Sequence, residues 1–223
     1  MVDGLIDAFL PARCRHCGAP GAALCEGCRA RLPWNLRACR HCALPVGAGD
    51  CCRDCATAPM FDAARAAFTL AAPIRETVHA MKYDADFGAA ALLGDLLAQR
   101  LAAGAAPLPE VLLPVPLHPR RLRARGYNQA LLLARALTRR LKLELHDEGA
   151  RCLRVTADQI GQSAAQRRKN LRGAFAIDAD LRGRRVALVD DVMTTGATLG
   201  ELARACRRAG AARVEAWVVA RVA

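Results

Sequence analysis

Past Pro59, short continuous apolar runs alternate with longer segments whose apolar residues recur at helical spacing. The short runs predict buried strands over residues 65–70, 111–116, 186–189 and 213–220. The longer segments predict helices over 73–83, 88–103 and 127–142, and a last helix that opens at residues 194–198 and runs to about Ala209. Strands and helices that alternate in this way favour an α/β fold, in which helices cover both faces of a parallel sheet.

The first sixty residues lack this pattern and are rich in cysteine. Eight of the eleven cysteines form four Cys-x-x-Cys pairs, namely Cys14/Cys17, Cys25/Cys28, Cys39/Cys42 and Cys52/Cys55. The two-residue gap lets both thiolates of a pair bind one tetrahedral ion, and two pairs complete a site. The segment therefore predicts two structural zinc ions, each contributing on the order of 10 kcal/mol to folding. We expect a double zinc ribbon over residues 1–60 and a second domain over 61–223.

Other uses of these cysteines remain open from the sequence. A rubredoxin-like iron site, an iron–sulfur cluster and redox-active dithiols all use closely spaced cysteines. We expect the first two pairs to share one ion and the last two another, in preference to an interleaved grouping. Cys51 is then a spare thiol, although its position beside Cys52 lets it exchange as a ligand. His16 and His41 are expected at the surface and not on the metal.

Length and charge narrow the class of protein. At 223 residues the chain has room for one domain of ordinary size and a small module. No apolar stretch reaches 18 residues, so the sequence predicts no membrane span. The formal net charge of +12 favours phosphate-bearing partners, whether small ligands, nucleic acid or an anionic membrane. Because cytosolic thiols stay reduced, the cysteines favour metal binding over disulfides.

The run from Val186 to Thr198 carries the strongest chemical signal in the chain. It predicts a buried strand that ends at two adjacent carboxylates, Asp190 and Asp191, and a small hydroxyl-rich loop that opens a helix. Backbone N–H groups at such a helix N-terminus, reached through Gly196, form a site for a phosphate. The carboxylates can accept hydrogen bonds from a sugar diol beside the same loop, so the run suits a 5-phosphorylated ribose.

Three further stretches are expected to face the same ligand. Residues 114–118 directly follow a predicted strand, where a loop can present backbone N–H groups to a diphosphate. Residues 119–129 place four arginines, Arg125 among them, at the entry to a helix, and arginine binds phosphate with two parallel hydrogen bonds. Residues 162–175 are polar and basic and predict a lid. Lys82, near the end of a predicted helix, is placed toward the same cleft.

The run 186–198 resembles the signature of the type I phosphoribosyltransferases, which bind phosphoribosyl pyrophosphate (PRPP). The resemblance implies that Asp190 and Asp191 hold the ribose 2′- and 3′-hydroxyls, as the catalytic pair. It implies that the 5′-phosphate lies in the loop of Thr194, Thr195, Gly196, Ala197 and Thr198. The wider set of ligand-binding residues then includes Val192, Met193, Lys82 and Arg125.

The order of the motifs over nearly the whole chain is similar to that of the ComF family. A Cys-x-x-Cys array is followed by Met-Lys-Tyr, Pro-Val-Pro-Leu-His-Pro, Arg-x-Arg-Gly-Tyr-Asn-Gln, Gln-Arg-Arg-x-Asn-Leu-Arg-Gly-Ala-Phe and the PRPP signature. These bacterial proteins are associated with DNA uptake in natural competence. The family implies a cytoplasmic protein, peripheral to the inner membrane, that handles incoming single-stranded DNA beside the uptake machinery.

Two classes of function follow, and the sequence leaves both open. As an enzyme, the protein would transfer the pentosyl group of PRPP, with Asp190 and Asp191 placing negative charge near the sugar. Magnesium, with Arg125, would stabilise the leaving diphosphate. As a non-catalytic module, it would sense PRPP or bind single-stranded DNA through its arginines. Aromatic residues make up only 4% of the chain, which argues against extensive base stacking.

Overall fold

The computed structural model describes residues 12–104, 107–154 and 171–223. Its centre is a five-stranded sheet in the order β1-β7-β6-β2-β3, and every pair of neighbours in it is parallel. The strands are β1 (Ala63–Thr69), β2 (Val111–Pro114), β3 (Glu144–Leu145), β6 (Arg185–Met193) and β7 (Arg213–Arg221). The central strands read as continuous apolar runs because both faces of the sheet are covered.

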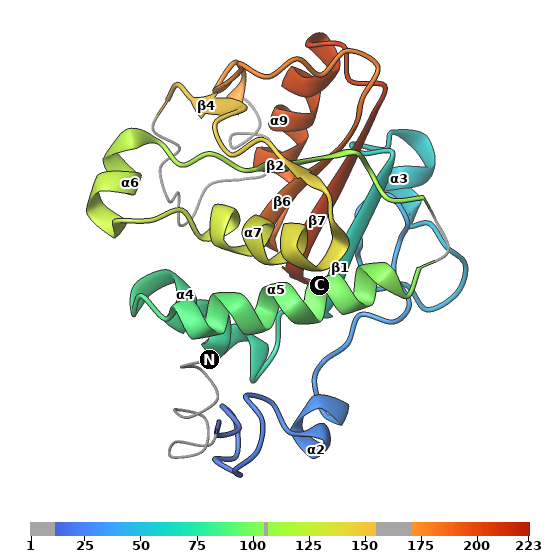
Figure 1. The fold of residues 1–223 in the computed structure, drawn as a ribbon. Coiled ribbons are helices and arrows are strands. Elements are labelled where there is room, and N and C mark those ends of the chain that lie inside the picture. Colours follow the sequence, from blue (N-terminus) through green and yellow to red (C-terminus); the bar gives the residue numbers. More distant parts are fainter. Residues whose placement is uncertain (1–11, 105–106, 155–170) are drawn as a thin grey trace.

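Helices cover both faces of the sheet, which confirms the α/β prediction (Figure 1). One face packs against α4 (Ile74–Tyr83), α5 (Phe87–Ala102) and α7 (Gln129–Leu141), and the other against α9 (Ala197–Arg208). Gly94 lets α5 approach α7 closely, since a Cβ atom there would lie 2.5 Å from the Cβ of Ala136. None of the described helices is both long and apolar enough to cross a membrane.

The cysteine-rich segment forms two small units beside this sheet. The first carries α2 (Glu26–Ala30) and the second carries α3 (Arg53–Thr57). The connection between them runs along the outer edge of β1, where the N–H groups of Asn35 and Ala64 donate to the carbonyls of Ala67 and Arg40 at 2.9 and 2.7 Å. The segment thus protects the exposed edge of the sheet, a position that would otherwise invite pairing with another chain.

Three features differ from the sequence prediction. The strand predicted to end at Val189 continues to Met193, because β7 runs beside it and pairs Val218 with Asp190 and Arg221 with Met193. The arginine-rich stretch forms its own helix, α6 (Pro119–Arg125), closed by Gly126 at φ 84°. A short antiparallel pair, β4 (Ala150–Cys152) and β5 (Phe175–Ile177), has no counterpart in the prediction. Most of the expected lid, residues 162–170, lies outside the described residues.

Candidate phosphoribosyl site and cysteine clusters

Asp190 and Asp191 lie near the end of β6, one on each face of the strand. Because side chains alternate along a strand, Asp190 follows the face packed on α9, and Asp191 follows the face packed on α4, α5 and α7. The Asp190 carboxylate accepts the N–H of Asp191 at 2.9 Å, and the Asp191 carboxylate accepts the N–H of Val192 at 2.7 Å. These local bonds fix both carboxylates at the carboxyl edge of the sheet, where α/β folds bind ligands.

Lys82, near the end of α4, lies against Asp191. Its Nζ is 2.8 Å from Oδ2 of Asp191, and the Asp191 residue is only 3% exposed. This oxygen accepts no hydrogen bond of good geometry from the described residues, so the ammonium is its close counter-charge. With the Lys82 ammonium as its close neighbour, this buried oxygen keeps further accepting capacity, which a ligand hydroxyl or a bound metal ion would use.

The closely spaced charged groups of this site shift the pKa values of Asp190 and Lys82. Burial, together with repulsion from Asp191, raises the pKa of Asp190 to about 8, although Lys82 opposes the change. Burial alone would lower the pKa of Lys82, but the attraction of Asp191 outweighs it and the pKa of Lys82 is raised. Near neutral pH the ligand-free site therefore favours a protonated Asp190 beside the ammonium group of Lys82.

The segment after β6 forms a turn that opens a helix. Thr194 and Thr195 are exposed, and Gly196 has a φ of 73°, a left-handed conformation that glycine adopts without strain. Ala197 and Thr198 are already the first residues of α9. Among the described residues the one side-chain contact that caps this helix is long, the Ala197 N–H donating to Oγ1 of Thr195 at 3.4 Å. The first N–H groups of α9 have no acceptor within the helix and can bind an anion.

The loop expected after β2 lies beside the same strand. Pro114 pairs with Val189 across the sheet, and the N–H of Val115 donates to the carbonyl of Val189 at 2.9 Å. Residues 114–118 therefore leave the sheet next to the two carboxylates. His118 then caps α6 by accepting the N–H of Arg120 at 3.2 Å.

Arg125 and the residues after it form a support that the sequence analysis did not assign. The Arg125 guanidinium donates to the Gln129 side chain at 2.6 Å and lies 5.5 Å from the ring centre of Tyr83, the neighbour of Lys82. The Tyr127 hydroxyl donates to the carbonyl of Met81 at 2.5 Å. The motif that contains Arg125 thus holds the end of α4, from which Lys82 extends. In the sequence, the one signal for this role is that residues 125–129 directly follow the arginine run.

The eight paired cysteines form two groups, Cys14/Cys17/Cys25/Cys28 and Cys39/Cys42/Cys52/Cys55, within each of which the sulfurs lie within 4.8 Å of one another. The sequential grouping is confirmed, and Cys51 belongs to neither group. The sulfurs of Cys17 and Cys25 are 3.6 Å apart and those of Cys42 and Cys52 are 3.5 Å apart. A tetrahedral zinc site with Zn–S bonds of about 2.3 Å has edges of about 3.8 Å, so both groups fit zinc.

Protonation supports the presence of a cation in these groups. The backbone N–H of Cys25 lowers the pKa of Cys14 to about 5, which yields a thiolate. Cys28 in the same group resists ionisation, since hydrogen bonds with the Cys17 and Cys25 side chains raise its pKa to about 12. Four thiols this close can all ionise only around a positive ion, as zinc supplies.

Together these features define a protein with two four-cysteine zinc ribbons and a phosphoribosyltransferase domain. Residues 5–56 match the model of a double zinc ribbon domain and residues 128–223 that of a phosphoribosyl transferase domain. The chain is 34% identical to "Competence protein F" of Haemophilus influenzae and 32% identical to "DNA utilization protein YhgH" of Salmonella typhi. These alignments cover 96% and 95% of this chain and 98% of each relative. The chain belongs to the ComF family.

A solved structure with a similar arrangement is glutamine PRPP amidotransferase from B. subtilis, complexed with ADP and GMP. The two are 23% identical, with a TM-score of 0.41, over 59% of this chain and 26% of the other.

Proposed function

We propose that the carboxyl edge of β6 and the loop after it bind PRPP together with magnesium. Asp190 and Asp191 hold the ribose hydroxyls, and residues Val192, Met193, Thr194, Thr195, Gly196, Ala197 and Thr198 surround the 5′-phosphate. The observation that carries the proposal is the buried Asp191 oxygen, which faces Lys82 and has no other close donor among the described residues, just before a helix N-terminus whose N-cap residue is a glycine. A diol and a phosphate would satisfy both ends of this site at once.

Lys82 and Arg125 give the site its positive side. Lys82 is half-buried, and Arg125 lies over the ring of the adjacent Tyr83, so both positive groups belong to one surface around the end of α4. We assign them to the diphosphate of PRPP. When bound, magnesium would neutralise charge on that leaving group, and the carboxylates would stabilise positive charge that develops on the sugar.

The charge pair tests the assignment directly. Changing Asp190→Asn and Asp191→Asn together keeps the size of both side chains but removes the negative charge, so we expect calorimetry to show no PRPP binding with magnesium. The change should not unfold the chain, because neither carboxylate holds an element of the sheet in place. Wild-type affinity in the folded double variant would overturn the assignment.

Catalysis is tested separately from binding. The pure protein is incubated with PRPP, magnesium and a panel of bases and amines, and diphosphate is measured. Release that depends on an acceptor would make the protein a pentosyl transferase. Tight binding without turnover would make it a PRPP-sensing or PRPP-binding module. We propose that in either case it acts in DNA uptake in the cytoplasm, beside the uptake machinery at the inner membrane, in keeping with the names of its relatives.

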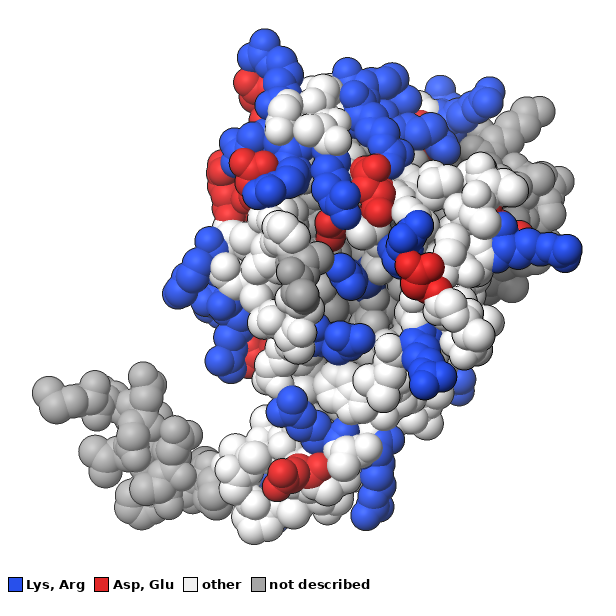
Figure 2. Space-filling view, turned by 90° about the vertical axis from the view of Figure 1, so that its right-hand side faces the viewer, with Lys and Arg blue, Asp and Glu red and all other residues white. Residues whose placement is uncertain are grey.

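A second proposal, single-stranded DNA binding, is supported by the exposed helix α6. It contains four arginines, no acidic residue and no buried residue, and Arg120 and Arg123 have no carboxylate partner among the described residues. Basic side chains also gather at the top of the face in Figure 2, the end of the molecule where α9 ends in Figure 1. Other arginines of the described residues are held in ion pairs, such as Arg182 with Asp180 and Arg184 with Glu144.

Removing two charges from α6 tests this second proposal. Arg123→Ala with Arg125→Ala should weaken binding of a single-stranded oligonucleotide and reduce the slope of log affinity against log salt by about 1.4, since each lost phosphate contact on a single strand removes roughly 0.7. The matched control, Arg182→Ala with Arg184→Ala, removes two arginines that already have carboxylate partners. An unchanged slope in the α6 variant would exclude α6 as a DNA contact.

A further inference from the structure

Arg221, the last residue of β7, connects the second cysteine group to the loop that follows β6. Its side chain is buried, and the residue is only 6% exposed. The guanidinium donates to the carbonyl of Cys42 at 2.9 Å and to the carbonyl of Met193 at 3.1 Å. It also donates to the carbonyls of Thr194 and Val222. One side chain thus binds a residue of the second cluster and the first residue of the candidate phosphate loop.

These contacts are unusual for a buried arginine. A buried guanidinium normally requires a carboxylate, but Arg221 pairs with none among the described residues: its hydrogen bonds go to backbone carbonyls, and the sulfur groups of the second cluster lie close enough to interact with its charge. Displacing any of these carbonyls would leave a buried charge incompletely satisfied. Arg221 therefore links the position of the Cys39–Cys42 turn to that of the loop after β6, because its hydrogen bonds to both can form together only in one arrangement.

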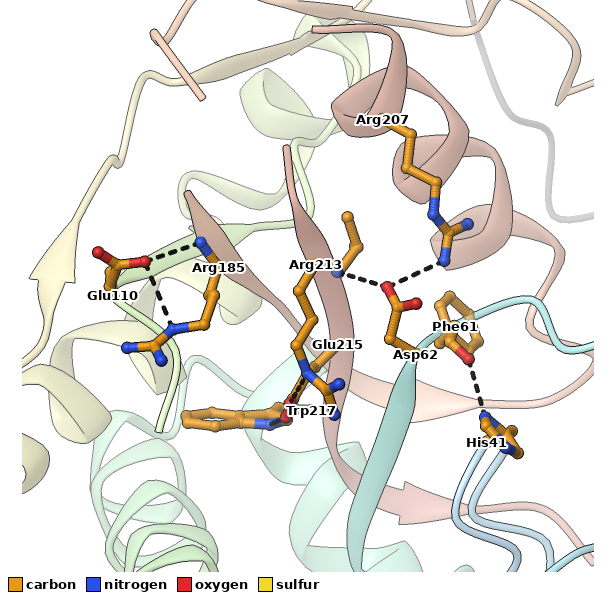
Figure 3. A network of polar contacts seen from close by, with 10 residues as sticks. His41, Phe61, Asp62, Glu110, Arg185, Arg207, Arg213, Glu215 and Trp217 are labelled. Carbon is orange, nitrogen blue, oxygen red and sulfur yellow. Dashed lines mark hydrogen bonds and ion pairs between the residues drawn. The ribbon is translucent and has the colours of Figure 1, made fainter. Parts of the chain in front are cut away.

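Further contacts join the second cluster to α9 on the other side of the loop. The His41 ring, in the turn between Cys39 and Cys42, hydrogen-bonds the carbonyl of Phe61 at 3.1 Å (Figure 3). The adjacent Asp62 accepts from Arg207 of α9 at 3.2 Å and from the N–H of Val214 at 2.7 Å (Figure 3).

Met60 packs on the start of α9. A Cβ atom at Gly196 would lie 2.9 Å from Cε of Met60, so the loop glycine is in close contact with the segment that leaves the second cluster. The carbonyl of Met60 in turn accepts from Arg207 at 3.0 Å. The loop is therefore held between this segment and Arg221.

We propose that Arg221 is a positioning residue through which the second four-cysteine cluster, when loaded with zinc, holds the loop of residues 194–198 in the geometry that binds a phosphoribosyl group. The inference rests on the proposed function of that loop. Loss of the metal would free the Cys39–Cys42 turn, remove the Cys42 carbonyl from Arg221 and release the Met193 and Thr194 carbonyls. The affinity for the 5′-phosphate would then depend on the metal state of a site that never touches the ligand.

Two cysteines provide a matched test, because Cys25 and Cys52 occupy equivalent places as the N-cap residues of α2 and α3. Cys52→Ser and Cys25→Ser are each made in the full chain, and zinc content and PRPP–magnesium affinity are measured. Each variant should lose one zinc. We expect the Cys52 variant to lose at least about tenfold in affinity and the Cys25 variant less than about twofold, a difference within the usual range of coupling between sites. Equal losses would overturn the proposal.

Arg221→Lys separates positioning from a general loss of fold. Lysine keeps the positive charge but cannot bind carbonyls on several sides as a guanidinium does. We expect this variant to retain two zinc ions and a cooperative unfolding transition but to bind PRPP about as weakly as the Cys52 variant. Wild-type affinity in this variant would show that Arg221 does not position the loop.

Hydrogen exchange provides a readout that needs no ligand. The amides of residues 194–198 should exchange faster in the Cys52 and Arg221 variants than in the Cys25 variant or the wild type. If the wild type binds no PRPP but the loop still responds in this way, the proposed ligand is wrong and the coupling stands. If exchange is the same in all four proteins, the coupling itself is wrong. Should Cys52→Ser not fold, removal of zinc with a chelator from Cys25→Ser, which already lacks the first ion, reports on the second cluster alone.

Discussion

The two cysteine clusters have the same ligands but very different connections to the rest of the molecule. The second contributes Ala43, which is fully buried in the core that includes α9, and is bonded to β7 through Arg221. The first is joined at the turn before α5 by an ion pair between Arg15 and Asp86, whose side chains are 30% and 26% exposed, and its Leu24, which is only partly buried, packs on the core of the α5 face. In Figure 1 α2 lies below the sheet, whereas α3 lies beside β1. Equal metal chemistry thus gives one integral unit and one attached unit.

The difference shows how a small zinc unit becomes part of a larger domain. Metal binding supplies the local folding free energy of both clusters, so it does not decide which one docks. Docking depends on groups outside the ligand set. In the second cluster these groups are backbone carbonyls and N–H groups with fixed partners in β1 and β7, such as the Arg40 carbonyl, which accepts from Ala64 at 2.7 Å.

The largest expected effect is on metal removal. Three of the four cysteines in the second cluster are buried, whereas in the first only Cys14 is buried and Cys17 is exposed. A chromogenic chelator should therefore remove two zinc ions in two phases, the first cluster losing its ion at least about tenfold faster through local opening. Detection of iron, or of no metal, would contradict the zinc assignment.

The same experiment shows which cluster supports the sheet. After the fast phase we expect the Tm of the sheet to change by less than about 2 °C, and after the slow phase to fall by more than about 5 °C, which corresponds to more than about 1 kcal/mol for a chain of this length. Cys25→Ser, from which the first zinc is already absent, should show only the slow phase. A fall in Tm during the fast phase would make the first cluster the integral one.

The sequence predicted the clusters and the carboxylate pair but not the connection between them. Cysteine spacing and the run Val186–Thr198 are local patterns, and each depends on residues close together in the chain. Arg221 ends an apolar strand, where a charged residue is ordinarily solvated, and the prediction stopped that strand at residue 220. Its burial arises only because Cys42 and Met193, distant in sequence, meet at the end of β7.

Shorter elements were missed for a similar reason. Strands β3, β4 and β5 have two or three residues each, too few for any periodicity to appear. The limits of β1, α5 and α7 agree with the predictions to within two residues, because α5 and α7 keep one apolar face and β1 is a nearly continuous apolar run. The predicted boundary after residue 60 remains a prediction, since residues 33–43 bond to β1 and pack with its core.

The effect of pH on PRPP binding provides a control for the comparison of the two clusters. This effect depends on the pKa of Asp190, which is shifted by burial, Asp191 and Lys82. The proposed ligand requires an ionised Asp190, whereas in the free protein its pKa is raised from 3.8 to about 8. Binding should therefore release about one proton at pH 7, and affinity should rise up to about tenfold per pH unit until about pH 8. Calorimetry in two buffers of different ionisation enthalpy measures this proton.

The stability of the ligand-free protein should fall as the pH rises, whereas the affinity for PRPP should increase. The raised pKa means that the folded state favours the protonated carboxyl, so the contribution of Asp190 to stability is fully present below about pH 4 and is lost as the pH rises through about 8. Asp190→Asn should therefore flatten the decline in Tm between about pH 4 and pH 8. Cys25→Ser should leave both the proton release and this decline unchanged, and a changed release would link the first cluster to the site.

The smallest effect is expected at the tether of the first cluster. Arg15→Ala removes a partly exposed ion pair with Asp86, so the free energy of unfolding should fall by less than about 1 kcal/mol. Asp86→Ala should cost about 1 kcal/mol more, because Asp86 also caps α5 by accepting the N–H of Ala89 at 2.9 Å. A double-mutant cycle measured by urea unfolding isolates the coupling between the two side chains. A coupling above about 2 kcal/mol would be far outside the range of exposed pairs. Such a value would show that the first cluster is held as firmly as the second. The two clusters would then not differ in the strength of their docking to the sheet.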